Sequence, residues 1–109
     1  MESVLLYRFE NDEIRISIDA YFEGNCLVID GYDHGRSVQA YWGDSDYEYV
    51  VRIPQAGIDF LFRHLSIEPG NRLALLHAMA ARFNTNSCYS DIRKLMSENG
   101  ITCEGFTWI

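Results

Sequence analysis

The segment "IRISIDAYFEGNCLVID", residues 14–30, decides the expected fold. Apolar side chains at positions 14, 16, 18 and 20 alternate with polar ones at 15, 17 and 19. This period of two predicts a strand with one buried face and one solvated face. Glu23-Gly24-Asn25 then predicts a tight turn into a second strand, residues 26–30. The two runs together predict an antiparallel hairpin.

Strands are also predicted on both sides of this hairpin. The run "VLLYRF", residues 4–9, precedes it and completes a three-strand meander. The run "YEYVVRI", residues 47–53, is a fourth strand, which places Tyr47 and Tyr49 on one face and Asp46 and Glu48 on the other.

After Pro54 the apolar period changes to that of helices. Apolar positions 58, 61, 62 and 65 predict a first helix, Asn71 is expected to cap a second over 71–83, and Ser87 a third that stops at Asn99-Gly100. Residues 101–109 are expected to form a last strand. We therefore predict one α+β domain over residues 1–109: an antiparallel sheet of four to five strands, the three-strand meander first, with two to three helices packed on one face.

Residues 33–43, "DHGRSVQAYWG", fit two patterns. Val38, Tyr41 and Trp42 have helical spacing, whereas Val38, Ala40 and Trp42 would share one face of a strand. We favour the helix.

The charge of the chain is concentrated in its first half. Residues 1–54 carry eleven acidic side chains against four arginines, and residues 55–109 carry five of each sign, so the first half holds the whole net charge of −7. Such a field repels nucleic-acid phosphates and attracts cationic partners. We therefore expect no nucleic-acid binding.

Several other classes of protein are disfavoured. No apolar run approaches the length of a membrane span, and no basic region precedes an apolar run at the N-terminus. Three cysteines without C-x-x-C spacing argue against a disulfide framework and a zinc site. We expect a cytoplasmic protein with no cofactor. Cys88 at a helix start lacks an assignable histidine base, so a cysteine enzyme is also disfavoured.

The acidic run "GDSDYEY", residues 43–49, invites a metal interpretation. An EF-hand count from Asp44 puts Tyr49 where glycine is needed and Gln55 where the bidentate glutamate belongs, so this motif fails. A site assembled in space remains an alternative. In such a site, within residues 30–48, Asp46 and Glu48 would meet Asp30 or Asp33 from the end of the preceding strand. The protein would then be a metal-dependent hydrolase with a divalent ion held by Asp33, His34, Asp44, Asp46 and Glu48.

The same region has the composition of a protein interface, because aromatic rings bury large areas at low entropic cost while carboxylates steer cationic partners. The alternative is that the rings only cap the edge of the core. The candidate binding residues are Asp33, Tyr41, Trp42, Asp44, Asp46, Tyr47, Glu48 and Tyr49.

The run "GDSDYEY", the helical stretch "RFNTNSCYSDIRKLMSENGI" and the closing Trp108 resemble a group of small bacterial α+β proteins of unassigned function. In that group a G-D-S-D-Y-E-Y strand precedes two or three helices, and a glycine turn precedes a final strand with tryptophan. Some of these proteins resemble immunity proteins of bacterial toxin systems. The resemblance implies a single acidic domain that binds and blocks a basic toxin.

We therefore expect a non-enzymatic protein-binding domain that occludes a partner, which the resemblance suggests is a basic toxin. A metal-dependent hydrolase is the second hypothesis. A homo-oligomer, for example a dimer, whose exposed aromatic side chains pair with themselves is the third.

Overall fold

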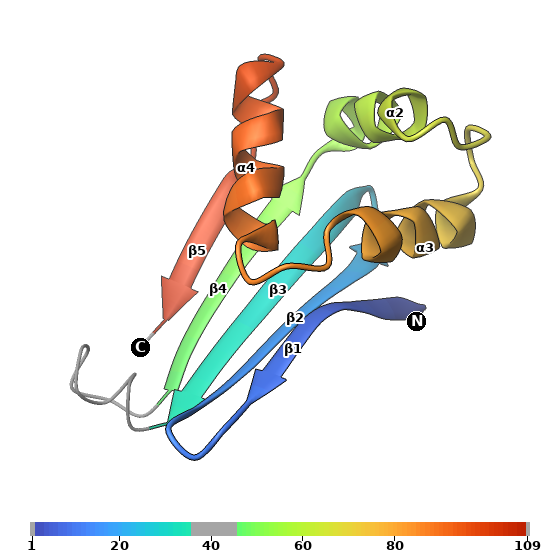
Figure 1. The fold of residues 1–109 in the computed structure, drawn as a ribbon. Helices are drawn as coiled ribbons and strands as arrows, with labels where there is room; N and C mark the ends of the chain where they lie inside the picture. Colours follow the sequence, from blue (N-terminus) through green and yellow to red (C-terminus); the bar gives the residue numbers. More distant parts are fainter. Residues whose placement is uncertain (1, 36–45, 109) are drawn as a thin grey trace.

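The computed structural model describes residues 2–35 and 46–108. Its antiparallel sheet has the strand order β1-β2-β3-β4-β5, so every strand pairs with its neighbours in the sequence of strands (Figure 1). The strands are β1 (Ser3–Glu10), β2 (Ile14–Glu23), β3 (Cys26–Gly35), β4 (Asp46–Ile53) and β5 (Glu104–Trp108). The described helices, α2 (Gln55–His64), α3 (Arg72–Arg82) and α4 (Cys88–Glu98), lie between β4 and β5. The predicted α+β class is confirmed.

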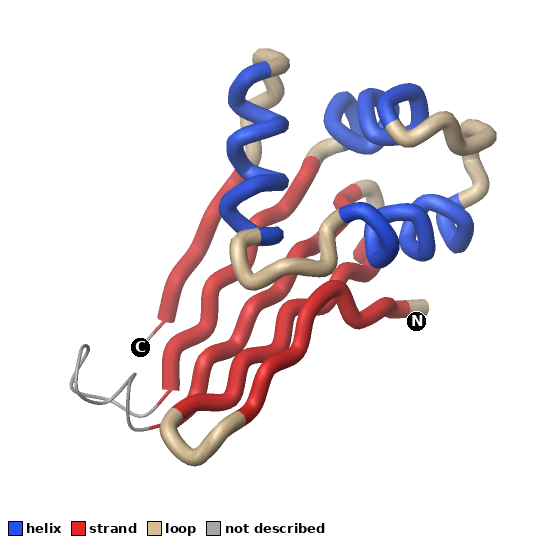
Figure 2. Tube along the Cα trace, in the orientation of Figure 1, coloured by secondary structure: helices blue, strands red, loops and turns tan. Residues whose placement is uncertain are grey.

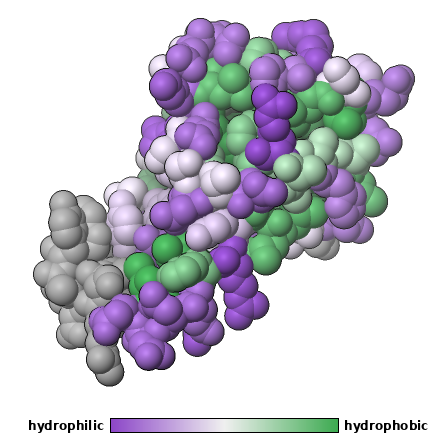
Figure 3. Space-filling model, in the orientation of Figure 1, coloured by the Kyte–Doolittle hydropathy of each residue, from purple (hydrophilic) through white to green (hydrophobic). Residues whose placement is uncertain are grey.

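All the described helices lie on the same side of the sheet (Figures 1 and 2). They cover one end of it, and the end that holds the β1–β2 turn extends beyond them, which gives the molecule an elongated shape of 43 × 24 × 23 Å. Figure 3 looks onto this side, where hydrophilic and hydrophobic side chains are interspersed over the helical end and a small apolar area lies on the sheet beyond it. The opposite face of the sheet carries no described helix; we call it the open face.

The core lies between the helices and the sheet. Alternate residues of β2, β3 and β4 point into it, as the period of two predicts, and meet the apolar stripes of the helices. Its fully buried larger side chains include Ile18, Leu27, Ile29, Ile53, Ile58, Leu61, Leu75, Leu76, Met79, Ile92 and Met96.

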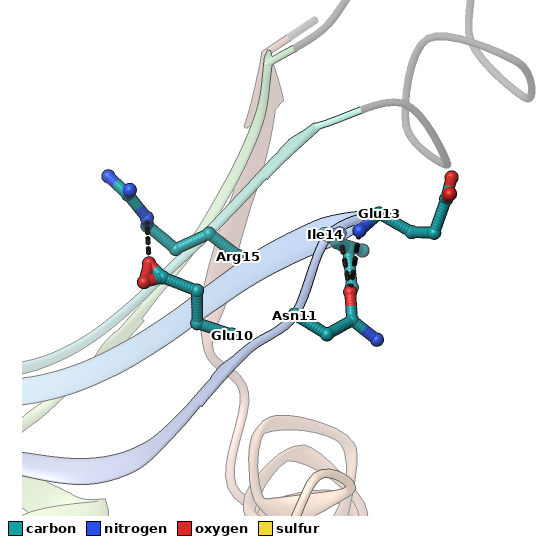
Figure 4. A network of polar contacts seen from close by, with 5 residues as sticks. All are labelled: Glu10, Asn11, Glu13, Ile14 and Arg15. Atoms are coloured by element: carbon teal, nitrogen blue, oxygen red, sulfur yellow. Dashed lines mark hydrogen bonds and ion pairs between the residues drawn. The ribbon is translucent and has the colours of Figure 1, made fainter.

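Two tight turns fix the register of the meander. In the β1–β2 turn, the Asn11 side-chain oxygen accepts hydrogen bonds from the backbone N–H groups of Glu13 (2.8 Å) and Ile14 (2.9 Å), as Figure 4 shows. In the β2–β3 turn, Gly24 adopts φ +59°, a left-handed conformation that glycine reaches without strain. Short loops with these residues leave antiparallel pairing as the only compact arrangement.

Several boundaries differ from those predicted. The third strand runs to Gly35, not Asp30. Residues 26–35 pair with β2 along one edge of the strand, and most of them pair with β4 along the other edge. Residues 33–35 are thus strand rather than the favoured helix, and the rest of that prediction, residues 36–43, lies outside the described residues. Asn71 caps α3 as predicted, whereas the Ser87 hydroxyl makes no capping bond and instead donates to Asp91.

Tyr49 and Gly31 form a close cross-strand pair on the helix side. They are directly opposite in the β3–β4 ladder, and the Tyr49 ring lies so near Gly31 that an added Cβ there would be 1.9 Å from a ring carbon. The Tyr49 hydroxyl donates to Asp33 (2.8 Å), and its ring packs edge-to-face on Tyr89 of α4 at 4.8 Å between centroids. The ring therefore joins the sheet to α4 across the gap that a glycine leaves.

We expect Gly31→Ala to destabilise the fold by about 1–3 kcal/mol, because the new methyl group overlaps the Tyr49 ring. In a Tyr49→Ala background the ring is absent, so the same substitution should cost little. Thermal or urea unfolding of the four proteins in this double-mutant cycle measures the difference. Equal costs in the two backgrounds would contradict the proposed overlap.

Candidate functional site

The open face is built from side chains that align in rows across the strands. One row crosses all five strands and contains Leu5, Asp19, Asp30, Val50 and Phe106, each directly opposite the next. Because directly opposite residues of antiparallel strands project to the same face, these side chains are neighbours. Acidic side chains thus occupy the centre of the row and apolar ones its ends.

A second row lies beside the first. It contains Ser17, Tyr32, Glu48 and Trp108, again directly opposite one another from β2 to β5. Glu48 is therefore diagonal to Asp30 and within reach of it. We call Asp19, Asp30 and Glu48, which come from three adjacent strands, the carboxylate cluster.

The carboxylate cluster brings like charges together. Asp19 is directly opposite Asp30, a placement that destabilises a sheet when both groups are ionised. Burial is the main cause that raises the pKa of Asp30, and a hydrogen bond with Glu48 and the charges of Glu48 and Asp19 act in the same direction. Together they raise this pKa to about 6. Burial also raises the pKa of Asp19. None of the three forms an ion pair with a described residue.

A shallow groove of about 320 Å³ runs from the carboxylate cluster to the edge of the sheet. Its far wall is formed by Phe106 and Trp108 of β5, whose rings stack at 6.0 Å between centroids and remain 42% and 52% exposed. Exposed rings of this size next to carboxylates are typical of a contact surface rather than of a core. The groove is lined by Tyr21, Asp30, Glu48, Val50, Arg52, Phe106 and Trp108.

Ion pairs flank the groove and the far end of the open face. Arg52 of β4 pairs with Glu23 of β2, so the pair passes over β3, where it lies beside the fully buried Val28. At the other end His34 bonds to Asp46, and that contact is the leading cause that lowers the pKa of Asp46. Arg52 is therefore engaged with Glu23 rather than with the carboxylate cluster.

The predicted binding residues divide between the two faces. Asp46 and Glu48 lie on the open face, whereas Asp33, Tyr47 and Tyr49 lie on the helix side, as the period of two requires. The other three, Tyr41, Trp42 and Asp44, lie outside the described residues.

The residues proposed to hold a divalent ion are divided in the same way. Asp33 lies on the helix side, and His34, Asp46 and Glu48 lie on the open face. Within residues 2–35 and 46–108 no group of three or more His, Cys, Asp or Glu side chains is placed to hold a metal ion. Cys88 is buried, and burial raises the pKa of its thiol to about 11, which disfavours the thiolate.

Sequence reasoning brought Asp30 together with Glu48 but missed Asp19, Tyr21, Phe106 and Trp108 as parts of the same surface. Alternation in residues 14–20 already placed Asp19 on the solvated face of its strand. Only the strand order and register bring Asp19 beside Asp30, and β5 beside β4. A pattern within one strand does not contain that information.

No protein-family model, curated protein or solved structure matches the chain. In the part of the chain that the structure describes, no helix has the length and apolar character needed to cross a membrane.

We expect Asp30→Asn to stabilise the protein at pH 7 by about 1 kcal/mol, a value that allows for solvent screening of a half-buried group. Because the pKa of Asp30 is raised to about 6 in the folded state, the stability that its neutral form contributes is complete below its ordinary pKa of 3.8 and is lost as the pH rises through 6. The advantage of the asparagine variant should therefore disappear near pH 4. Urea unfolding of both proteins across this range measures it.

Glu68→Gln is the matched control for this measurement, since it removes one negative charge from an exposed position between α2 and α3. Its effect on unfolding should be small at every pH. An equal stabilisation by Glu68→Gln would mean that net charge, not the carboxylate cluster, is responsible.

Proposed function

We propose that this chain is a non-enzymatic protein-binding domain whose open face contacts a basic partner protein. The observation that carries the proposal is the carboxylate cluster, Asp19, Asp30 and Glu48, held together without an ion pair among the described residues, beside the exposed Phe106 and Trp108. A cationic surface placed there would relieve the repulsion between the carboxylates. Relief of this repulsion would therefore contribute to the free energy of binding.

The two kinds of side chain have separate roles in this proposal. The rings of Phe106 and Trp108 supply buried area, the usual source of affinity in an interface. The carboxylates raise the association rate of a cationic partner and reject acidic ones, and the net charge of −7 acts in the same direction at longer range. Binding would block the partner by occlusion.

An immunity-like role, in which the blocked partner is a basic toxin, is the finer form of the proposal. It is supported by the resemblance of "GDSDYEY" and the following helices to immunity-like proteins and by the sign of the charge. A cytoplasmic location is part of it, and all three cysteines being free thiols supports that location. A homo-oligomer would use the same exposed rings, but pairing two copies there would bring like charges together. The hydrolase hypothesis has no comparable supporting observation among the described residues.

The double variant Asp30→Asn with Glu48→Gln tests the proposal. Immobilised wild-type protein should retain a basic protein from an extract of its source cells, and the double variant should retain at least about tenfold less, because each lost charge pair across an interface weakens binding. With the retained protein purified, stopped-flow association should be slower for the variant and less dependent on salt concentration.

Glu68→Gln with Glu98→Gln is the matched control, because it removes the same charge from exposed positions on the helix side. This control should bind like the wild type. Retention that is unchanged in the open-face variant, or reduced equally in both variants, would refute an interface on the open face.

A further inference from the structure

A second cavity lies on the helix side of the sheet, on the opposite face from the proposed interface. It has a volume of about 320 Å³ and lies between β3, β4 and β5 and the first turns of α4. Every residue that lines it carries a polar side-chain group, which contrasts with the apolar core that the helices otherwise make with the sheet. Asp33, Tyr47, Tyr49, Tyr89 and Arg93 face it.

Asp33 supplies a negative charge to this cavity from a strand face that is otherwise apolar. It lies on β3 at a position whose strand neighbours on the same face, Ile29 and Leu27, are in the core. The Tyr49 hydroxyl donates to one of its oxygens at 2.8 Å and so fixes the carboxylate. Burial raises the pKa of Asp33 above its ordinary value, so placing the charged form here costs stability.

Arg93 supplies a positive charge from α4. Its guanidinium lies against the backbone of β5 at Gly105, where an added Cβ would be 3.0 Å from both terminal nitrogens. The group also lies over the Tyr89 ring, 5.9 Å from its centroid. No carboxylate of the described residues, Asp33 included, forms an ion pair with it. A glycine at 105 thus gives the guanidinium room beside the cavity.

We propose that this cavity binds a small zwitterion of the α-amino acid class, with its carboxylate on Arg93 and its ammonium on Asp33. The proposal rests on two opposite charges that line one cavity without pairing with each other. The tyrosine rings add to ammonium binding, because the face of an aromatic ring attracts cations. Arginine suits the other end, since its planar fork binds a carboxylate through two parallel hydrogen bonds.

Simple ions fit the cavity less well than a zwitterion. An anion on Arg93 would be repelled by Asp33 and by the net charge of −7, and a cation on Asp33 would be repelled by Arg93. A ligand with both charges satisfies both side chains and carries no net charge. The site is independent of the proposed function, because its residues lie on the other face of the sheet.

The test uses the full-length protein and free L-amino acids as probes at millimolar concentration. At least one amino acid should raise the melting temperature by an amount that grows with the logarithm of its concentration. Its carboxamide, which lacks the carboxylate, and its N-acetyl form, which lacks the ammonium, should each bind at least about tenfold more weakly by calorimetry. Failure of every amino acid to raise the melting temperature would overturn the proposal.

Two variants assign the ends of the ligand. Arg93→Gln should bind the amino acid about tenfold more weakly than wild type does, and it should no longer distinguish the acid from the carboxamide. Asp33→Asn keeps an acceptor for Tyr49 and should no longer distinguish the free amine from the N-acetyl form. Lys94→Gln, on the neighbouring exposed position of α4, should bind like wild type. Equal affinity for parent and analogues in the wild type would overturn the proposal without any variant.

Discussion

The pairing of β5 with β4 is the constraint on which the rest of the structure depends. The chain leaves the sheet at Ile53, forms the helices, and returns at Glu104 to the strand that it left. Both ends of the helical segment are thereby held at the same edge of the sheet, so the helices pack on one face of it (Figure 1). That face takes most of the apolar side chains, and the open face carries mainly polar ones, with a few apolar side chains such as Val28 and Val50 among them.

Strand β4 shows how one short sequence serves two surfaces. Its alternation sends Asp46 and Glu48 to the open face and Tyr47 and Tyr49 to the helix side, where Tyr49 contacts Gly31 and Asp33 of β3. The described part of this acidic and aromatic run, residues 46–49, is therefore divided between the two faces of the sheet. An interpretation of these four residues as a single site conflicts with the period of two.

The succession of strands and helices along the chain was predictable, because each element is marked by a local signal in the sequence. Alternation in residues 14–20 and the Gly24 turn define the meander, and the change of period after Pro54 marks the helical segment. The surfaces were not predictable, because Asp19 meets Asp30, and Trp108 meets Glu48, only through pairing between strands. The cavity likewise depends on where α4 places Arg93 against Gly105, which follows from packing and not from local sequence.

Solubility alone does not account for the carboxylate cluster. A negatively charged chain is equally soluble when its charges are dispersed, and dispersion avoids the repulsion that opposite placement of Asp19 and Asp30 creates. On the helix side, by contrast, charges of opposite sign occur together, since Asp33 and Arg93 line the same cavity. Concentrating one sign beside exposed rings on the open face lowers stability, and stability is commonly sacrificed in this way where a surface has to bind. The arrangement of charges, more than their number, is thus the feature of this protein on which the proposal of a binding partner rests.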